Sequence, residues 1–213
     1  MSCDIYQADG IEWCRENPSA GAVVTSLPDP ENIIFPEGSE YEGQPWRWFR
    51  AAIEASAEAT HPNAPLVLRQ TDRRDNGTTS KAALAFDVLL NRSDSDWRLL
   101  WHKVILQQEP ETTNIHRPTY SHLLAFGRSA VGPGSRTPDV LRPGDKLYDN
   151  GMGLATAERA VEFAGSAHEM IVDPFCGRGT VPVMADALGY SAIGVDLDPQ
   201  QVAHARNLTL TRP

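Results

Sequence analysis

The chain has 213 residues, which is enough for one domain with a sizeable hydrophobic core and barely enough for two. It is 41% hydrophobic and 22% charged, an ordinary globular composition, and no apolar run approaches the ~20 residues of a membrane span. The net charge of -9 argues against a broad, non-specific grip on duplex nucleic acid, although a local basic face could still bind it. With three cysteines and no basic-then-apolar start, we expect no disulfide framework, no metal site and a cytoplasmic location.

The first 130 residues alternate short apolar runs with helical patterns. Apolar or alternating runs predict strands at 5–10, 22–25, 66–68, 97–106 and 117–126, and helical spacing predicts helices at 11–16, 46–60 and 81–90. Strands that alternate with helices are typical of an α/β fold with a mostly parallel sheet.

Polar residues follow two of these strands. The tetrapeptide Ser26-Leu27-Pro28-Asp29 comes after the second strand, and a charged run from Arg69 to Arg74 comes after the third. In open α/β sheets ligands bind beyond the carboxyl ends of the strands, so both segments are candidates for a site. A polar turn and a solvated charged loop are the plain alternatives.

The segment 131–149 is rich in glycine and proline, and it overlaps a stretch of the chain that has an excess of positive charge. Between Arg117 and Lys146 there are five Lys or Arg residues and two acids, Asp139 and Asp145. This excess is the best candidate for contacting a phosphate backbone. The segment is too short to supply the surface of a sequence-specific DNA reader.

The C-terminal part carries the strongest pattern of the chain. A short apolar strand at 170–172 runs into Asp173-Pro174, a turn with Gly177 and Gly179 follows, and a helix is expected at 180–188. A second strand at 192–196 ends in Asp196, 19 positions after Gly177, near the ~20 at which an acid meets a ribose in dinucleotide folds. Pro182 replaces the third glycine of the dinucleotide pattern, so a cofactor with one ribose and no pyrophosphate is favoured. Further helices are expected at 155–164 and 200–208.

The sequence Asp-Pro-Phe-Cys-Gly-Arg-Gly-Thr (173–180), followed by Gly-Val-Asp-Leu-Asp (194–198), resembles the S-adenosylmethionine (SAM) signature of class I methyltransferases. Its late position, and Tyr-x-His-Leu-Leu-x-Phe at 120–126, are similar to the circularly permuted amino-methyltransferases that modify adenine or cytosine in nucleic acids. The resemblance implies one Rossmann-like domain over 1–213 with a mostly parallel, seven-stranded sheet containing one antiparallel strand. Residues 1–130 would form the catalytic-loop half, 131–149 a linker or recognition loop, and 150–213 the SAM-binding half.

The resemblance also implies roles for individual residues. Asp173 would bind near the methionine amino group of SAM, Asp196 would bind the ribose hydroxyls, and Asp9 would lie near the adenine, unless Asp9 only caps a helix. Cys176 would be a small filler within the turn, because this type of methyl transfer needs no covalent enzyme intermediate. The expected cofactor set is Asp9, Thr25, Asp173, Phe175, Cys176, Gly177, Gly179, Thr180, Asp196 and Leu197.

The tetrapeptide 26–29 is similar to the catalytic loop of that family, which reads Asp/Asn/Ser-Pro-Pro-aromatic. The Ser26 hydroxyl and the Leu27 carbonyl would accept the two N–H bonds of an exocyclic amine and so aim its lone pair at the methyl group. Asp29 stands where the family has an aromatic that stacks on the base. Stacking could come instead from Phe35, Trp46 or Trp48, or Asp29 could bind a different amine. The expected catalytic set is Ser26, Leu27, Pro28 and Asp29.

These features predict methylation of an exocyclic amino group of a nucleobase. RNA is favoured over DNA, because an exposed single-stranded base needs no extrusion from a helix. Methylation of a small molecule or a protein side chain, and a non-catalytic SAM-binding accessory subunit, are the alternatives. Nucleic acid is the expected partner, no membrane is expected, and a partner subunit could supply substrate recognition. The candidate substrate-binding residues are Arg69, Arg73, Arg117 and Arg128.

Overall fold

Two short parallel strands lie side by side at the centre of the computed structural model, which describes residues 2–75, 77–91, 95–115, 117–134 and 136–210. They are β2 (Ala22–Thr25) and β9 (Met170–Asp173), paired in the register Val23 to Val172. All four residues of β2 are buried, because helices cover both faces of the sheet at this point. Segments from opposite ends of the chain therefore share one hydrophobic core.

Within the described ranges, the main sheet has eight strands in the order β1-β10-β9-β2-β3-β7-β6-β8. Of these strands only β7 runs antiparallel to its neighbours, β3 and β6. The expected mostly parallel sheet with one antiparallel strand is confirmed. The last two strands of the chain, β9 and β10, lie in the sheet between the first two strands, β1 and β2. Circular permutation itself stays a prediction. The remaining strands are β1 (Cys3–Gln7), β3 (Leu66–Gln70), β6 (Arg98–Leu106), β7 (Tyr120–Gly127), β8 (Val140–Leu141) and β10 (Ser191–Asp196).

The expected count of seven strands was one too low, because β8 adds a short eighth strand at the edge. This strand runs parallel to β6 within the segment expected to be a linker or recognition loop. The buried Lys103 ammonium of β6 donates to the backbone carbonyls of Thr137 and Pro138 at 3.0 and 2.9 Å, and the Val104 N–H donates to the Asp139 carbonyl at 2.8 Å. These bonds hold the segment along the sheet edge.

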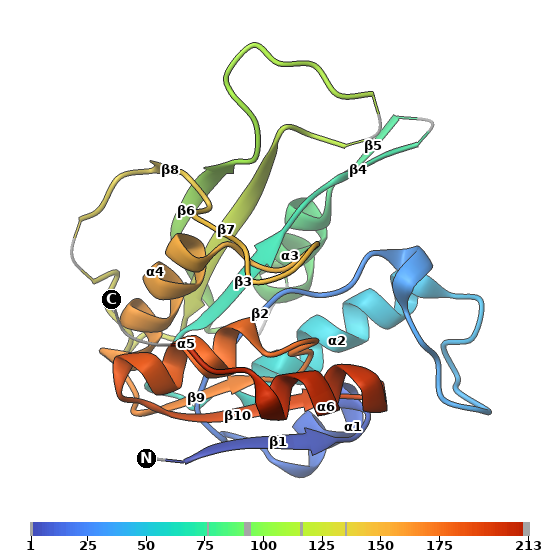
Figure 1. Cartoon of the computed structure of the whole chain (residues 1–213), viewed down its shortest axis with the longest axis vertical. Coiled ribbons are helices and arrows are strands. Elements are labelled where there is room, and N and C mark those ends of the chain that lie inside the picture. Colours follow the sequence, from blue (N-terminus) through green and yellow to red (C-terminus); the bar gives the residue numbers. More distant parts are fainter. Residues whose placement is uncertain (1, 76, 92–94, 116, 135, 211–213) are drawn as a thin grey trace.

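A small hairpin projects beyond the carboxyl end of β3. It consists of β4 (Arg73–Asp75) and β5 (Gly77–Thr79), so part of the charged run, for which a solvated loop was the alternative interpretation, is paired strand. The Arg74 guanidinium donates to the carbonyl of Asn114 at 2.7 Å and so ties the hairpin to the loop between β6 and β7. Figure 1 shows the hairpin and this loop together at the top of the molecule.

Six helices of the described chain cover the two faces of the sheet (Figure 1). One face carries α1 (Gly10–Glu16), α2 (Pro45–Ala59) and α3 (Lys81–Leu90), and a 3-10 turn, η1 (Pro30–Asn32), precedes α2. The other face carries α4 (Leu154–Gly165), α5 (Thr180–Leu188) and α6 (Pro199–Asn207). No helix among the described residues is both long and apolar enough to cross a membrane.

The position of the site follows from the direction of two connections. The chain leaves β2 through α2 toward β3 on one side, and it leaves β9 through α5 toward β10 on the other. Adjacent parallel strands whose connections diverge leave a crevice at their carboxyl ends, where open α/β sheets bind ligands.

Candidate active site

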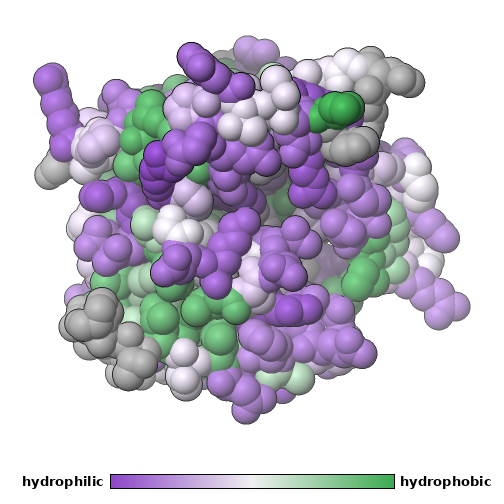
Figure 2. All heavy atoms as spheres, turned by 45° about the horizontal axis from the view of Figure 1, so that its top comes forward, coloured by the Kyte–Doolittle hydropathy of each residue, from purple (hydrophilic) through white to green (hydrophobic). Residues whose placement is uncertain are grey.

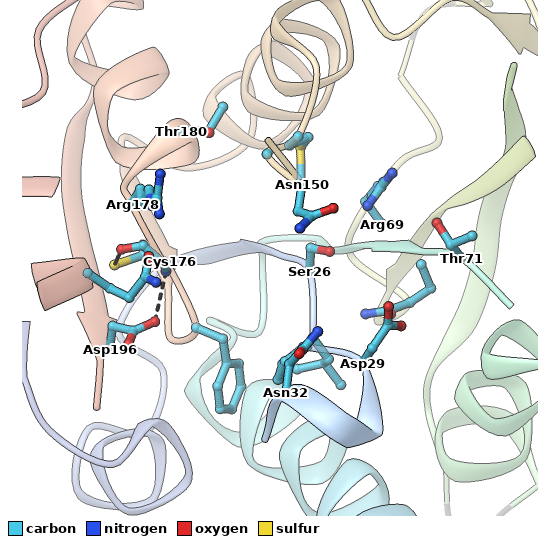
Figure 3. A pocket seen from close by; sticks show the side chains of 18 of the residues that line it. Ser26, Asp29, Asn32, Arg69, Thr71, Asn150, Cys176, Arg178, Thr180 and Asp196 are labelled. Atoms are coloured by element: carbon cyan, nitrogen blue, oxygen red, sulfur yellow. Dashed lines mark hydrogen bonds between the residues drawn. The ribbon is translucent and has the colours of Figure 1, made fainter. Parts of the chain in front are cut away.

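A cavity of about 780 Å³ lies beyond the carboxyl ends of β2, β3, β9 and β10. The glycine turn that follows β9 and the Ser26–Asp29 loop that follows β2 both line it. Figure 3 shows Ser26 near the middle of this cavity, with Cys176, Arg178 and Asp196 on one side and Asp29, Arg69 and Thr71 on the other. The structure thus brings together the two segments that the sequence singled out most strongly.

Asp173 is the most deeply placed acid of the cavity. Its side chain is buried, and its Oδ1 accepts hydrogen bonds from the Thr25 hydroxyl at 2.6 Å and the Phe175 N–H at 3.2 Å. Burial raises the pKa of Asp173 from 3.8 to about 7, although both hydrogen bonds lower it. The carboxyl group is therefore poised to change charge near neutral pH.

The two glycines of the turn have different roles. Gly177 has a φ of 53°, lines the cavity, and has only the Gln201 side chain within 4 Å of an added Cβ, at 3.9 Å. Gly179 has a φ of 91°, and an added Cβ would lie 2.9 Å from the Cβ of Ala205 on α6. Gly177 thus leaves room at the cavity wall, whereas Gly179, expected to face the cofactor, permits close packing between the turn and α6.

Asp196 ends β10 and fixes the turn from the neighbouring strand. Its Oδ2 accepts the Gly177 N–H at 2.9 Å, and its Oδ1 accepts the Asp198 N–H at 2.9 Å. Burial raises the pKa of Asp196. Asp9 lines the cavity from the end of β1 and also caps α1, accepting the N–H groups of Ile11 and Glu12 at 2.8 and 3.0 Å. Both interpretations of Asp9 are therefore compatible.

Asp29 lies within a cluster of positive charges. Its Oδ1 forms an ion pair with the Lys81 ammonium, and its Oδ2 lies 3.0 Å from Nη2 of Arg117. The Lys81 side chain is 1% exposed, and burial lowers the pKa of Lys81 while Asp29 raises it. Lys81 was missing from the candidate residues, because a single lysine at the start of a helix gives no sequence signal of a buried ion pair.

The four candidate arginines separate into two groups. Arg69 and Arg117 line the cavity, whereas Arg73, which forms an ion pair with Glu31, is outside its lining. Arg128 lies elsewhere: its guanidinium donates to the Thr60 and Ala57 carbonyls at 3.0 and 3.3 Å, at the end of α2. The expected place of Arg128 near the substrate is therefore not found, since its charge satisfies carbonyls that a helix end leaves unpaired.

Of the three aromatic residues considered for stacking, Trp48 lines the cavity, and its ring contacts Phe175 edge-to-face with centroids 5.4 Å apart. Phe35 and Trp46 pack against the hydrophobic core instead. No sequence signal pointed to Tyr148, whose hydroxyl accepts a hydrogen bond from Thr180 Oγ1 at 2.6 Å. Other lining residues, which were not among the named catalytic, cofactor-binding or substrate-binding candidates, include Asn32, Gln70, Thr71, Gln107, Gln108, Asn114, Lys146, Arg178 and Gln201.

The residues beside the glycine turn match the chemistry of SAM. Three carboxyl groups, of Asp9, Asp173 and Asp196, lie where a cation and sugar hydroxyls need acceptors, and Gly177 leaves the turn open for close approach. Among the described residues no group of three or more His, Cys, Asp or Glu side chains is arranged to hold a metal ion.

Comparison with known proteins agrees with this geometry. A family model described as DNA methylase, of the N6/N4 methyltransferase type, matches residues 45–207. Because the match covers well over half of the chain, the protein belongs to this family and is a SAM-dependent methyltransferase. A search of curated protein sequences found no match.

Solved structures share the fold at low sequence identity. A candidate DNA modification methylase from Thermus thermophilus is 20% identical, with a TM-score of 0.68 over 95% of this chain and 92% of that chain. The same protein in complex with SAM gives a TM-score of 0.66 at 19% identity over 95% and 90% of the two chains. The cytosine-N4-specific PvuII DNA methyltransferase gives 0.66 at 16% identity over 95% and 84%.

Proposed function

We propose that this enzyme transfers the methyl group of SAM to the exocyclic amino group of a nucleobase in DNA. The observation that carries the proposal is the convergence of the Ser26–Asp29 loop and the Asp173–Thr180 turn on one cavity of divided charge. In one half the acids at the ends of β1, β9 and β10 outnumber Arg178, and in the other half Arg69, Lys81 and Arg117 outnumber Asp29. An acidic half suits a cationic donor, and a basic half suits a polyanionic acceptor.

In the acidic half, each group has a partner on SAM. The Asp173 carboxylate would accept from the ammonium group, and the Asp196 oxygens would accept from the ribose hydroxyls, as acids do at this position in related folds. Phe175 and Trp48 supply an apolar wall for the adenine ring. Bound SAM supplies an electrophilic methyl group on its sulfonium centre.

The Ser26 loop would activate the acceptor by position. An exocyclic amine is a weak nucleophile because its lone pair is delocalised into the ring of the base. When the Ser26 hydroxyl and the Leu27 carbonyl accept the two N–H bonds, the nitrogen is drawn toward tetrahedral geometry and its lone pair points at the methyl group. Fixed acceptors and near-attack geometry then supply most of the rate.

The family assignment favours DNA as the substrate, since the matching family is described as DNA methylase. This reverses the preference for RNA drawn from the sequence, which was based on the cost of extruding a base from a duplex. The cavity extends to the loop between β6 and β7, where Gln107, Gln108 and Asn114 line it. The face of the molecule with the top of Figure 1 turned forward is largely hydrophilic (Figure 2). Such a surface suits a nucleic acid better than an apolar small molecule.

Methyl-transfer assays with SAM labelled in its methyl group test the proposal. Unmethylated genomic DNA, native or heat-denatured, and total RNA should be offered separately to the purified chain and to Ser26→Ala. The proposal expects label in DNA as N6-methyladenine or N4-methylcytosine, and much less with Ser26→Ala. Label found only in RNA would show that the substrate is RNA and not DNA. Label in neither would exclude nucleic acid as the substrate.

A further inference from the structure

Three cations surround one carboxylate on the β3 side of the cavity. The Lys81 ammonium pairs with one oxygen of Asp29 and the Arg117 guanidinium with the other, the latter at 3.0 Å. Burial lowers the pKa of Arg69. Arg69 also interacts with the charges of Asp29 and Arg117, because Asp29 raises its pKa and Arg117 lowers it. One carboxylate cannot neutralise three cations, so this part of the cavity carries an excess of positive charge.

The excess charge is poorly solvated. Burial lowers the pKa of both Arg69 and Lys81, and the Asp29 side chain is 18% exposed. Among the described residues, the Arg69 guanidinium has neither a hydrogen-bond acceptor nor an ion-pair partner. A desolvated cation that is only partly neutralised is costly, and the cost falls when an anion binds beside it.

A second polar group without a hydrogen-bond partner in the described part of the chain belongs to Gln70, the residue that follows Arg69 on β3. Gln70 lines the cavity and is 1% exposed, yet its Nε2 has no hydrogen-bond partner in the described part of the chain. Buried amides are almost always hydrogen-bonded, so an unpaired one beside a cavity indicates a place for a polar ligand. Two adjacent residues of β3 thus independently indicate the same location.

On these grounds we propose that Arg69 and Arg117 bind a phosphate group of the nucleotide that carries the acceptor amine. This inference rests on the proposed function, which supplies a nucleotide as the substrate. Guanidinium groups match phosphate oxygens with paired hydrogen bonds, and phosphate contacts fix the position of a nucleic acid without reading its sequence. Figure 3 shows Arg69 and Asp29 on the side of Ser26 away from Asp196, where the acceptor would lie.

Lys81 has a different role in this site. Its side chain is 1% exposed, and its ammonium is already paired with the carboxylate of Asp29. It is therefore a positioning residue that neutralises Asp29, so that the carboxylate does not repel the phosphate. Asp29, which stands where related enzymes have an aromatic, would then orient Arg117 through their ion pair.

Paired small ligands test the inference without turnover. With the demethylated product S-adenosylhomocysteine bound, calorimetry should compare adenosine with AMP and cytidine with CMP, in ribo and deoxy forms, and inorganic phosphate alone. We expect at least one monophosphate to bind about tenfold more tightly than its nucleoside, a gain that shrinks with added salt. Equal affinities of nucleoside and monophosphate throughout would overturn the inference.

Variants of the two arginines test whether these residues cause the tighter binding of the monophosphate. Arg69→Gln and Arg117→Gln should each remove most of it, and Arg159→Gln, an equal charge change on the exposed surface of α4, should keep it. Arg117 is 52% exposed, so its variant should fold even if Arg69→Gln does not. A gain that survives Arg117→Gln, or that Arg159→Gln abolishes equally, contradicts the assignment.

The charge balance gives a sharper test of Lys81. Lys81→Met should reduce the gain, because the Asp29 carboxylate is then unpaired, and the double variant Asp29→Asn/Lys81→Met should restore part of it. Failure of Lys81→Met to change the gain contradicts the role of Lys81. If the monophosphate gain is found but no nucleic acid is methylated, the phosphate site stands and the proposed function falls. If DNA is methylated but the monophosphate binds no more tightly than the nucleoside, the proposed function stands and the phosphate site is wrong.

Discussion

The Thr25 hydroxyl donates a 2.6 Å hydrogen bond to Oδ1 of Asp173, joining residues 148 positions apart in the chain. Thr25 ends β2 and directly precedes the Ser26 loop, while Asp173 ends β9 and directly precedes the glycine turn. Both groups are buried, so the bond is protected from water and fixes the two loops relative to each other. The distance between the methyl donor and the acceptor amine would be set by this contact.

The charge of Asp173 should control SAM affinity. Because the pKa of Asp173 is raised to about 7, the group is ionised above that pH and neutral below it. SAM should therefore bind more tightly at pH 8 than at pH 6, and Asp173→Asn should bind it about tenfold more weakly at pH 8. Calorimetric titrations of both proteins across this range check the point, and an equal pH dependence in Asp173→Asn would contradict it.

The same group should destabilise the free enzyme as pH rises. Between pH 3.8 and about 7 the folded chain holds a proton on Asp173 that the unfolded chain has released. The contribution of Asp173 to the free energy of unfolding therefore falls as the pH rises through this window and stays low above it. Urea unfolding at pH 5 and pH 8 should show a smaller difference for Asp173→Asn than for the unchanged chain, and an identical difference would refute the assignment.

Ser26 should act on turnover and not on the cofactor. Ser26→Ala removes one acceptor for the amine but leaves the Thr25–Asp173 bond and the glycine turn unchanged. We expect SAM affinity to be retained and kcat to fall about 100-fold, as when one preorganised hydrogen-bonding group is lost from an active site. Steady-state kinetics with the nucleic acid that the enzyme methylates decide this. Full activity of Ser26→Ala would rule out amine positioning by this hydroxyl.

The two glycines of the turn should respond differently to alanine. At both positions φ is positive, which costs an alanine about 1 to 2 kcal/mol of unfolding free energy. Gly179→Ala should cost more, because its Cβ would overlap Ala205, whereas Gly177→Ala should chiefly weaken SAM binding. Denaturant unfolding combined with SAM titration separates the two effects, and equal stability losses would contradict the packing difference.

Gln70 should be tolerated by the fold but required by the substrate. Its buried, unpaired Nε2 costs stability, so Gln70→Leu should leave the unfolding free energy unchanged or raise it by about 1 kcal/mol. Thr156→Val is the matched control, since the Thr156 Oγ1 is also buried and unpaired but lies outside the cavity. Both variants should remain stable while only Gln70→Leu loses substrate affinity; a large loss of stability in Gln70→Leu would show that its amide is structurally paired.

Local patterns predicted much of this molecule. The strand, glycine turn and helix around Asp173 form because proline and glycine end one element and cap the next, and this information lies within a dozen residues. The resemblance of 26–29 to a catalytic loop singled out Ser26, which lines the same cavity, while its catalytic role stays a prediction. Such motifs can be recognised in a sequence because local backbone geometry determines their residue types.

Long-range charge pairing could not be predicted in the same way. Lys81 and Asp29 are 52 positions apart, and neither belongs to a pattern that implies the other. Arg128 was taken for a substrate contact because it stands in a basic stretch, yet the end of α2 uses its charge. Where a charged side chain points depends on the packing of distant elements, which the sequence does not display.

The most direct measurement is mass spectrometry of nucleosides from DNA and RNA of cells that express the unchanged chain, Asp173→Asn or Ser26→Ala. We predict an N6-methyladenine or N4-methylcytosine signal in DNA with the unchanged chain only. Absence of any new methylated base, or an equal signal with both variants, would contradict methyl transfer between these two loops.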